Sequence, residues 1–414
     1  MYYALKENVY FVNGEARGCI YDFNSSKLYS LSRLLADEID LISRGLPCNE
    51  QNNTNLKNVL DELCQIGILT LSDNRTVSNI EEIKLPNRSS QFAWIEITNI
   101  CNLRCRHCYN ESDSRCTTTM SIDDYKHVVD CLDQLGVKRV QIIGGEPFAE
   151  KKLLKEMLEY TIGKFEFIEI FTNGTLIDGE WFDFLAKNNI RIALSVYSYR
   201  PEIHDYVTCY DGSWKKTNST IQSLREHGIS YRICNVLMKG VEIGEKGTDL
   251  YELSSEKDIV RMSGRASFSL LTDDLIRKKL ITKKSFESPV NKNFVARLIS
   301  GHNCFRDRLY ISADMQIYPC VMERRLTHGA INNEAGFNLD DSIRNLNKDK
   351  IAECNLCEYR YACFDCRPNS LSGDCFEKPW YCTYNPREGE WENEDEFVEE
   401  LKNVGSNKQE QCRM

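Results

Sequence analysis

Between residues 91 and about 262, short apolar segments typical of strands alternate with segments of helical periodicity. The predicted strands lie at residues 92–98, 138–145, 167–174, 190–198 and 230–238. The predicted helices between them lie at residues 121–136, 151–163, 178–189 and 213–228. Apolar strands that alternate with helices form a parallel sheet covered by helices. An α/β fold is therefore predicted, in which ligands bind beyond the carboxyl ends of the strands.

The composition is that of a soluble globular protein, with 42% hydrophobic and 28% charged residues among 414. No apolar run approaches the roughly 20 residues needed to cross a bilayer. The first residues, MYYALKENVYFVNG, do not have the pattern of a secretion signal. We therefore expect a cytoplasmic protein without a membrane partner. The net charge of −10 argues against general nucleic-acid binding, which depends on a basic surface.

Residues 1–85 are predicted to form a small unit of their own. Residues 8–32 contain short strands separated by the turn sequences NGE and NSS, and helical patterns follow at residues 33–45 and 54–67. The polar stretch at residues 72–90 contains Pro86 and is predicted to be a linker.

Cysteines are unusually frequent, with 19 in the chain, and many are clustered at short spacings. In a long chain without a secretion signal, such clusters bind metal more often than they form disulfides. Cys101, Cys105 and Cys108 follow the first predicted strand with the spacing C-x3-C-x2-C. Three thiolates on an iron–sulfur cluster leave one iron open, and a molecule with an amino and a carboxylate group can chelate it. Taken alone, the motif could also be a zinc site or chance.

Three further motifs lie at the predicted ends of the next strands. They are GGEP (Gly144, Gly145, Glu146, Pro147), TNG with Thr172 and Asn173, and SVYS with Ser195. The two glycines let backbone groups approach a ligand closely, and the Glu146 carboxylate adds negative charge near a ligand ammonium. The side chains of Asn173 and Ser195 can bond ribose hydroxyls or a carboxylate.

Together these motifs resemble the radical S-adenosylmethionine (SAM) superfamily. The resemblance implies a partial (β/α)6 TIM-like barrel over residues 91–290 and a four-iron cluster on the three cysteines, with SAM bound beside it. His107 occupies the position of an aromatic residue that packs against adenine. The family also has an arginine shortly after the HD sequence, which helps to hold the SAM carboxylate. This chain has Thr208 in that region.

A second group of cysteines lies between residues 300 and 390. Its members are Cys304, Cys320, Cys354, Cys357, Cys363, Cys366, Cys375 and Cys382. Eight thiolates can hold two fully ligated four-iron clusters. The alternative from the residues alone is a pair of zinc knuckles.

The C-terminal pattern resembles the SPASM domain, a cysteine-rich extension of radical SAM enzymes that holds two auxiliary clusters. The resemblance assigns four cysteines to an outer cluster: Cys354, Cys357, Cys363 and Cys382. It assigns Cys304, Cys320 and Cys366 to an inner cluster, with Cys375 as the candidate fourth ligand. If Cys375 does not bind, the inner cluster keeps an open iron. The chain departs from the family in having Met315 in place of a glycine, and C-x2-C where C-x3-C is usual.

The remaining cysteines are assigned no role. They are Cys19, Cys48, Cys64, Cys116, Cys131, Cys209, Cys234 and Cys412. The N-terminal unit resembles the winged-helix-like, PqqD-like recognition element of peptide-modifying enzymes. Related modules bind the leader of a precursor peptide as an extra strand on a sheet edge. The alternative is a structural cap on the barrel. Residues 391–414 are expected to form an acidic tail.

The whole chain thus resembles a radical SAM/SPASM peptide maturase with three four-iron clusters. The resemblance implies reductive cleavage of SAM to a 5′-deoxyadenosyl radical, removal of a substrate hydrogen atom and formation of a crosslink, for which we expect a cysteine thioether. The expected partners are a leader-bearing precursor peptide and an electron donor such as flavodoxin or ferredoxin. Three alternatives stay open: a carbon–carbon crosslinking enzyme, a formylglycine-forming enzyme like the anaerobic sulfatase maturases, and a non-catalytic iron–sulfur scaffold that presents a peptide.

Overall fold

The computed structural model describes residues 2–48, 54–86, 90–246, 253, 258–302, 304–331, 337–367 and 374–411, with side chains described as far as residue 403. These residues belong to two compact units. One unit combines Met1–Asn87, Leu280–Asn303 and Asn345–Leu401, and the other combines Arg88–Lys279, Cys304–Arg344 and Lys402–Met414. We call them the N-terminal unit and the barrel unit.

The barrel unit is built on an eight-stranded sheet with the order β10-β9-β8-β7-β6-β13-β14-β15. Neighbouring strands from β10 to β13 are parallel, and β14 and β15 continue the sheet in antiparallel fashion. The parallel strands are β6 (Phe92–Glu96), β7 (Arg139–Ile143), β8 (Phe167–Thr172), β9 (Arg191–Ser195), β10 (Tyr231–Cys234) and β13 (Arg308–Ile311). The antiparallel strands are β14 (Gln316–Tyr318) and β15 (Gly329–Ala330). This arrangement confirms the predicted α/β fold with a parallel sheet.

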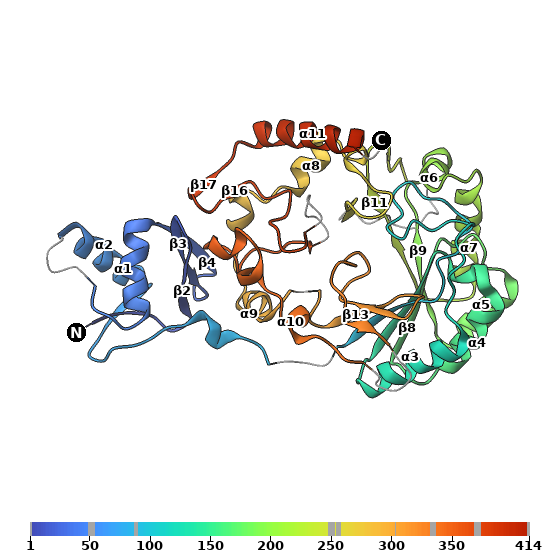
Figure 1. Ribbon diagram of the computed structural model, residues 1–414, viewed down its shortest axis with the longest axis horizontal. Helices are drawn as coiled ribbons and strands as arrows, with labels where there is room; N and C mark the ends of the chain where they lie inside the picture. Colours follow the sequence, from blue (N-terminus) through green and yellow to red (C-terminus); the bar gives the residue numbers. More distant parts are fainter. Residues whose placement is uncertain are drawn as a thin grey trace. The chain divides into compact units, whose positions relative to one another are not determined.

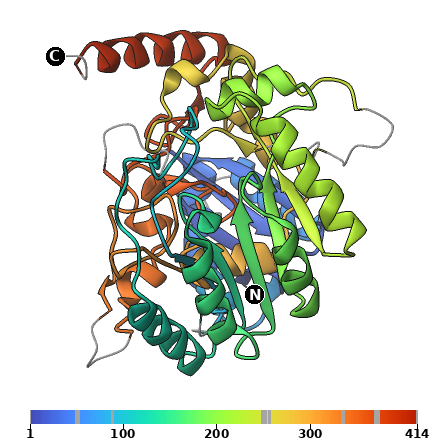
Figure 2. The same ribbon diagram turned by 90° about the vertical axis from the view of Figure 1, so that its right-hand side faces the viewer.

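Helices follow the parallel strands and cover the outer face of the sheet (Figures 1 and 2). They are α3 (Ile122–Gln134), α4 (Lys151–Thr161), α5 (Gly179–Lys187) and α7 (Ser213–Glu226). Their apolar faces pack on strand residues such as Val140, Ile170 and Ile192 in one continuous core. The α3 helix begins as predicted, because the Ser121 hydroxyl accepts a hydrogen bond from the backbone N–H of Asp124.

Two features of the sheet differ from the sequence prediction. The segment predicted as one strand at residues 230–238 is divided, since β10 ends at Cys234 and β11 (Val236–Leu237) pairs with β12 (Asp258–Ile259) in a separate sheet. The sixth parallel strand is β13, which pairs with β6 and follows residue 300 in the chain. The structure also has a short helix, α6 (Pro201–Thr208), that the periodicity did not predict.

The turn between β13 and β14 contains Met315, at the position where the SPASM resemblance expects glycine. Met315 has a φ of 65°, in the left-handed region that side chains with a Cβ rarely adopt. This backbone conformation explains why the family usually has a glycine at this position. The present chain adopts the same conformation with a methionine. Part of the cost is offset because the Met315 side chain packs against the barrel core.

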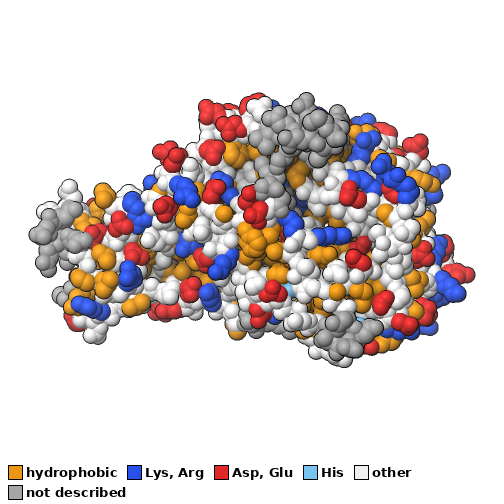
Figure 3. Space-filling model, in the orientation of Figure 1, with side chains coloured by type: hydrophobic (Ala, Val, Ile, Leu, Met, Phe, Trp, Pro, Cys, Tyr) orange, Lys and Arg blue, Asp and Glu red, His pale blue; other side chains and the backbone are white. Residues whose placement is uncertain are grey.

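Smaller elements complete the barrel unit. They are η3 (Pro147–Glu150), η4 (Phe268–Leu270), α8 (Asp273–Lys279) and α10 (Asp341–Arg344). The last helix of the chain, α11, runs over Glu394–Gln411. Among the described residues, no helix is long and apolar enough to span a membrane. Acidic and basic side chains are interspersed over the face shown in Figure 3.

The N-terminal unit contains an antiparallel sheet of β2 (Val9–Asn13), β3 (Arg17–Asp22) and β4 (Lys27–Ser32), and a second pair of β1 (Tyr2–Leu5) with β5 (Leu69–Ser72). The helices α1 (Arg33–Ser43) and α2 (Thr54–Gln65) follow. Strand residues with one parity, including Phe11, Ile20 and Leu31, face the core that contains these helices.

Strand residues with the other parity face a second core. Tyr10, Val12, Cys19 and Tyr21 pack there with side chains from the C-terminal part of the same unit, including Tyr359, Tyr361 and Tyr384. The predicted linker also contributes, because η2 (Ile80–Ile83) buries Ile80 in this core. The three-stranded sheet is therefore covered on both faces.

The C-terminal part of this unit has little regular structure. Its elements are η5 (Lys283–Phe286), α9 (Lys292–Ser300), η6 (Lys348–Lys350), η7 (Cys354–Leu356), β16 (Tyr384–Asn385) and β17 (Glu390–Trp391). Because this region has few backbone hydrogen bonds between strands, its stability depends on side-chain contacts and on any group that its cysteines bind.

Candidate functional site

A cavity of about 410 Å³ opens at the carboxyl ends of the parallel strands in the barrel unit. Cys101, Cys105 and Cys108 line it, together with residues from the ends of β7, β8, β9 and β10. The predicted site residues that line it are His107, Gly144, Gly145, Thr172, Asn173 and Ser195. The folded chain therefore brings together motifs that are separated by up to 94 positions in the sequence.

The three-cysteine loop is held by backbone hydrogen bonds to its surroundings. The N–H of Cys101 donates to the Asp113 carbonyl at 3.2 Å. The N–H groups of Arg104 and Arg106 donate to the carbonyls of Thr208 and Val207 at 3.2 and 3.0 Å, at the end of α6. The loop conformation is thus set by contacts with α6, the helix that contains the HD sequence.

A second support comes from the sequence SGR at residues 263–265. The Arg265 N–H donates to the Cys108 carbonyl at 3.0 Å, and its guanidinium donates to the carbonyls of Ser112, at 2.9 Å, and Glu111. Gly264 has a φ of 57°, and a Cβ there would lie 2.4 Å from the Cys108 carbonyl oxygen. Only glycine therefore permits this approach to the cluster loop.

Gly144 and Gly145 lie at the cavity wall. Because they have no side chain, the loop that contains them can pack closely against the end of a neighbouring strand. A Cβ on Gly144 would lie 2.5 Å from the Thr98 carbonyl oxygen, and one on Gly145 would lie 2.3 Å from that of Ile100. The loop after β7 therefore touches the segment that leads into Cys101.

Glu146 is fully buried and does not line the cavity. Its carboxylate accepts hydrogen bonds from the N–H of Phe148 (3.0 Å), the Thr172 hydroxyl (2.7 Å) and the N–H of Asn173 (2.8 Å). Burial raises the pKa of this carboxyl to about 7. Glu146 thus joins the ends of β7 and β8, and its predicted negative charge near a ligand ammonium stays a prediction. Pro147 is buried beside it at the start of η3.

The other predicted polar residues do face the cavity. The Asn173 amide donates to Asn102 Oδ1 at 3.0 Å and lies 4.0 Å from Cys101 Sγ. Ser195 ends β9 close to Tyr197, whose ring packs edge-on against His107 at 4.9 Å between centroids. Tyr197 also lines the cavity, within the SVYS motif, but the sequence did not indicate its role.

The chemistry of the lining fits the cluster and SAM that the sequence implies. Burial, with a further contribution from Glu146, raises the pKa of the Cys101 thiol to about 12, so a thiolate there needs a bound positive charge such as iron. Burial lowers the pKa of His107 to about 4, which keeps the imidazole neutral. Its buried Nδ1 has no hydrogen-bond partner within the described part of the chain, which suits an edge facing a ligand.

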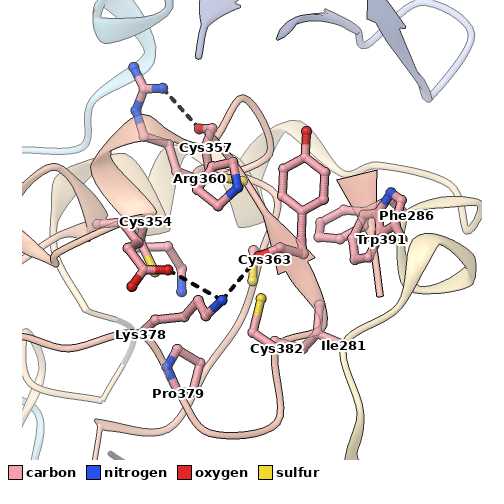
Figure 4. A pocket seen from close by; sticks show the side chains of 14 residues that line it. Ile281, Phe286, Cys354, Cys357, Arg360, Cys363, Lys378, Pro379, Cys382 and Trp391 are labelled. Carbon is pink, nitrogen blue, oxygen red and sulfur yellow. Dashed lines mark hydrogen bonds and ion pairs between the residues drawn. The ribbon is translucent and has the colours of Figure 1, made fainter. Parts of the chain in front are cut away.

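A second cysteine-lined cavity lies in the N-terminal unit. Cys354, Cys357, Cys363 and Cys382, the predicted outer-cluster set, all line it (Figure 4). Cys363 and Cys382 lie next to each other, and Cys354 approaches from beside Lys378. Lys348, Lys378 and Arg360 also line the cavity and supply positive charge around the four sulfurs. The four thiols and their surroundings therefore suit an anionic iron–sulfur cluster.

The predicted inner set is divided between the two units. Cys304 and Cys320 belong to the barrel unit and lie near enough to interact electrostatically. Cys366 and Cys375 belong to the N-terminal unit, where the Cys366 N–H donates to the Tyr381 hydroxyl and the Cys375 carbonyl accepts from Arg367. The joint ligation of an inner cluster by these four cysteines stays a prediction.

Across the described ranges, no three His, Cys, Asp or Glu side chains are gathered tightly enough to hold one metal ion. A cluster of four irons and four sulfides places its ligands at its corners, farther apart than the ligands of a single ion.

Comparison with known families finds a match for the part of the chain that contains the three-cysteine loop. Residues 95–247 match the model of the Radical SAM superfamily, and the match covers the three-cysteine loop and the ends of β7, β8 and β9. This part of the chain is similar to radical SAM domains.

Relatives of the radical SAM domain include proteins of different activity. The chain is 31% identical over 237 residues to the antilisterial bacteriocin subtilosin biosynthesis protein AlbA of Bacillus subtilis, a match that covers 56% of this chain and 50% of AlbA. It is 29% identical over 179 residues to a GTP 3′,8-cyclase of Petrotoga mobilis, covering 42% and 54%. The chain spans about half the length of the curated relatives it matches.

Two solved structures also align with the chain. Streptococcus suis SuiB is 15% identical with a TM-score of 0.47, and the alignment covers 88% of this chain and 96% of SuiB. The enzyme anSMEcpe with bound AdoMet is 17% identical with a TM-score of 0.48, covering 77% and 99%.

Gly264 and Arg265 are the main residues around the three-cysteine loop that the sequence analysis missed. They lie more than 150 positions after the loop that they support. The only local signal is the glycine in a short SGR sequence, which is too common to indicate a site by itself.

Proposed function

We propose that this chain is a radical SAM enzyme that modifies a ribosomally made precursor peptide, with three four-iron clusters. The observation that carries the proposal is the loop of Cys101, Cys105 and Cys108 at a cavity formed by the strand ends of a radical SAM domain. When bound, the cluster and SAM would supply a 5′-deoxyadenosyl radical that removes a hydrogen atom from a substrate carbon.

The chain's own residues would bind and orient SAM. Asn173 and Ser195 offer polar groups for the ribose or the carboxylate, and His107 offers a neutral ring for the adenine. The Thr208 hydroxyl, in the region where the family has an arginine, is hydrogen-bonded to Ser213 at 2.7 Å, so we propose that another residue takes the role of that arginine. Arg232 and Arg261 both line the cavity and are the cationic candidates for this role.

A peptide substrate is favoured by the similarity to AlbA and by the N-terminal sheet. In that sheet β4 pairs only with β3 among the described strands, whereas η2 and the Ser78 side chain lie against β2. We therefore assign the outer edge of β4, Lys27–Ser32, as the place where a leader peptide adds a strand. Leader binding would slow amide hydrogen exchange in β4 but leave β2 unchanged. Protection elsewhere would exclude this edge.

The product that we propose is a thioether between a cysteine sulfur and a carbon of another residue. The C-terminal cysteines would hold auxiliary clusters that accept the electron released as the bond forms. A carbon–carbon crosslink needs the same electron acceptor but no thiol. Alkylation of the matured peptide under reducing conditions distinguishes them: a product lighter by two hydrogens that still reacts at every cysteine would exclude the thioether. A formylglycine product would be recognised by its aldehyde.

The central experiment is anaerobic incubation of the reconstituted enzyme with SAM and a reductant. Replacing Cys101, Cys105 and Cys108 together with Ala should abolish 5′-deoxyadenosine formation and leave iron bound to the C-terminal cysteines. The matched control is Cys116→Ala, a nearby cysteine that is not assigned to the cluster, which should retain activity. Undiminished SAM cleavage by the triple variant would refute the proposal. An iron-loaded wild type that never cleaves SAM would favour the non-catalytic scaffold.

A further inference from the structure

The cavity of the outer cysteine set contains a buried lysine whose role the proposed chemistry does not explain. Lys348 is 7% exposed and lines the cavity together with Cys354 and Cys363. Its ammonium lies 2.6 Å from Asp365 Oδ1 as an ion pair. It also interacts with the Cys363 thiol, where its positive charge favours the thiolate. An ammonium has three N–H donors, so this one retains donors for a group in the cavity.

Lys348 shares its partner carboxylate with a second buried cation. Asp365 is 3% exposed and pairs with both Lys348 and Arg367, and Arg367 is itself 2% exposed. Two buried cations thus share one buried carboxylate. Burying an excess charge is costly unless a counter-charge lies close by. A four-iron cluster with four thiolates carries net negative charge and would supply it.

Lys378, the other lysine at this cavity, differs from Lys348 in its exposure and in its protein partners. Lys378 is partly exposed, pairs with Glu353 at 3.3 Å and donates to the Tyr384 carbonyl at 3.1 Å. Its charge is already balanced by protein groups (Figure 4). Of the two lysines at this cavity, Lys348 is therefore the one whose remaining donors and buried charge point to a ligand.

We propose that Lys348 sets the reduction potential of the outer cluster by donating an N–H to one of its sulfurs. This inference rests on the proposed function, since it requires the cluster. One-electron reduction would add one negative charge to the cluster, and this step requires no proton transfer. A buried cation stabilises the reduced form more than the oxidised form. In the proposed reaction, the electron would come from the substrate radical as the crosslink forms.

The test is a potentiometric titration followed by electron paramagnetic resonance, on enzyme reconstituted anaerobically. The radical cluster is removed by replacing Cys101, Cys105 and Cys108 with Ala, so that only auxiliary clusters contribute. The outer-cluster signal is identified as the one lost when Cys354 and Cys357 are also replaced with Ala.

Lys348→Met should shift the midpoint to lower potential, so that the ratio of reduced to oxidised cluster at a fixed potential falls about tenfold, equivalent to about 59 mV. For Lys348→Arg, the ratio of reduced to oxidised cluster should stay within about threefold of the parent ratio. The same is expected for Lys378→Met. If Lys348→Met fails to retain iron, Lys348→Gln supplies the neutral comparison and should show the same fall.

An unchanged midpoint in an iron-loaded neutral variant would overturn the role of Lys348 and leave the cluster assignment intact. A parent protein with no iron signal that depends on Cys354 and Cys357 would overturn both.

Discussion

The Tyr21 hydroxyl donates a hydrogen bond to the Glu358 carbonyl at 2.9 Å, which links strand β3 to the residue that follows Cys357. Neighbouring backbone groups continue the contact, because the N–H of Glu15 donates to the Leu356 carbonyl at 2.8 Å. The three-stranded sheet and the loop that contains Cys354 and Cys357 are therefore parts of one packed structure. Deleting residues 1–85 would expose this core, so a truncation cannot test peptide recognition alone.

Tyr21→Phe should destabilise the N-terminal unit by about 1–2 kcal/mol, because it leaves the buried Glu358 carbonyl without its donor. The measurement is the urea midpoint of the anaerobic holoenzyme, with the iron content recorded at each point. Tyr10→Phe, in the same core, should have a smaller effect, because the Tyr10 hydroxyl forms no hydrogen bond with any residue that the structure describes. Equal effects of the two substitutions would show that the Tyr21 bond contributes nothing specific.

Glu146 should give the enzyme a pH-dependent stability. Its folded pKa of about 7 lies above the ordinary value of 4.5. The folded state therefore holds this proton more tightly, and the free energy of unfolding falls as the pH rises from about 4.5 to about 7, then becomes constant. Glu146→Gln should flatten that slope relative to the wild type. Glu166→Gln, an exposed control, should keep it. Parallel pH profiles for wild type and Glu146→Gln would contradict the argument.

His107 should act mainly through its ring. We expect His107→Phe to bind SAM within about threefold of the wild type, and His107→Ala to bind about tenfold more weakly, because an aromatic contact contributes about 1 kcal/mol beyond its buried area. Equilibrium dialysis of anaerobically reconstituted enzyme measures this. If Phe is as damaging as Ala, the Nδ1 atom makes an essential hydrogen bond to SAM.

Arg265 should be needed for a stable radical cluster. Arg265→Lys loses the forked geometry that reaches the Glu111 and Ser112 carbonyls together, so the cluster loop should hold iron less well. The expected result is a loss of at least half of the radical-cluster signal in electron paramagnetic resonance. Arg115→Ala is the control, because that exposed arginine pairs with the Asp113 carboxylate in the same loop. Full signal in Arg265→Lys would remove Arg265 from the support of the loop.

The sequence predicted the strands and helices of the barrel closely because each lies in an uninterrupted pattern. Residues 167–174 were predicted as a strand, and β8 covers Phe167–Thr172. The same patterns could not predict that β13 joins β6, since pairing between strands more than 200 positions apart leaves no local signal. The break after Cys234 was missed for a similar reason: residues 230–238 contain many residues that favour strands, such as Tyr231 and Ile233, but Val236 pairs with β12.

By itself, the sequence determined the chemistry that the site can perform. The spacing of Cys101, Cys105 and Cys108 and the motifs at the strand ends depend on residue type and short separation, which a sequence records directly. Only the tertiary structure decided what each side chain faces. It turned Glu146 away from the cavity, brought Arg265 to the cluster loop and buried Lys348 beside the outer cysteines. Burial and contact arise from groups that are distant in the chain, so their effects on charge and binding appear only in the folded protein.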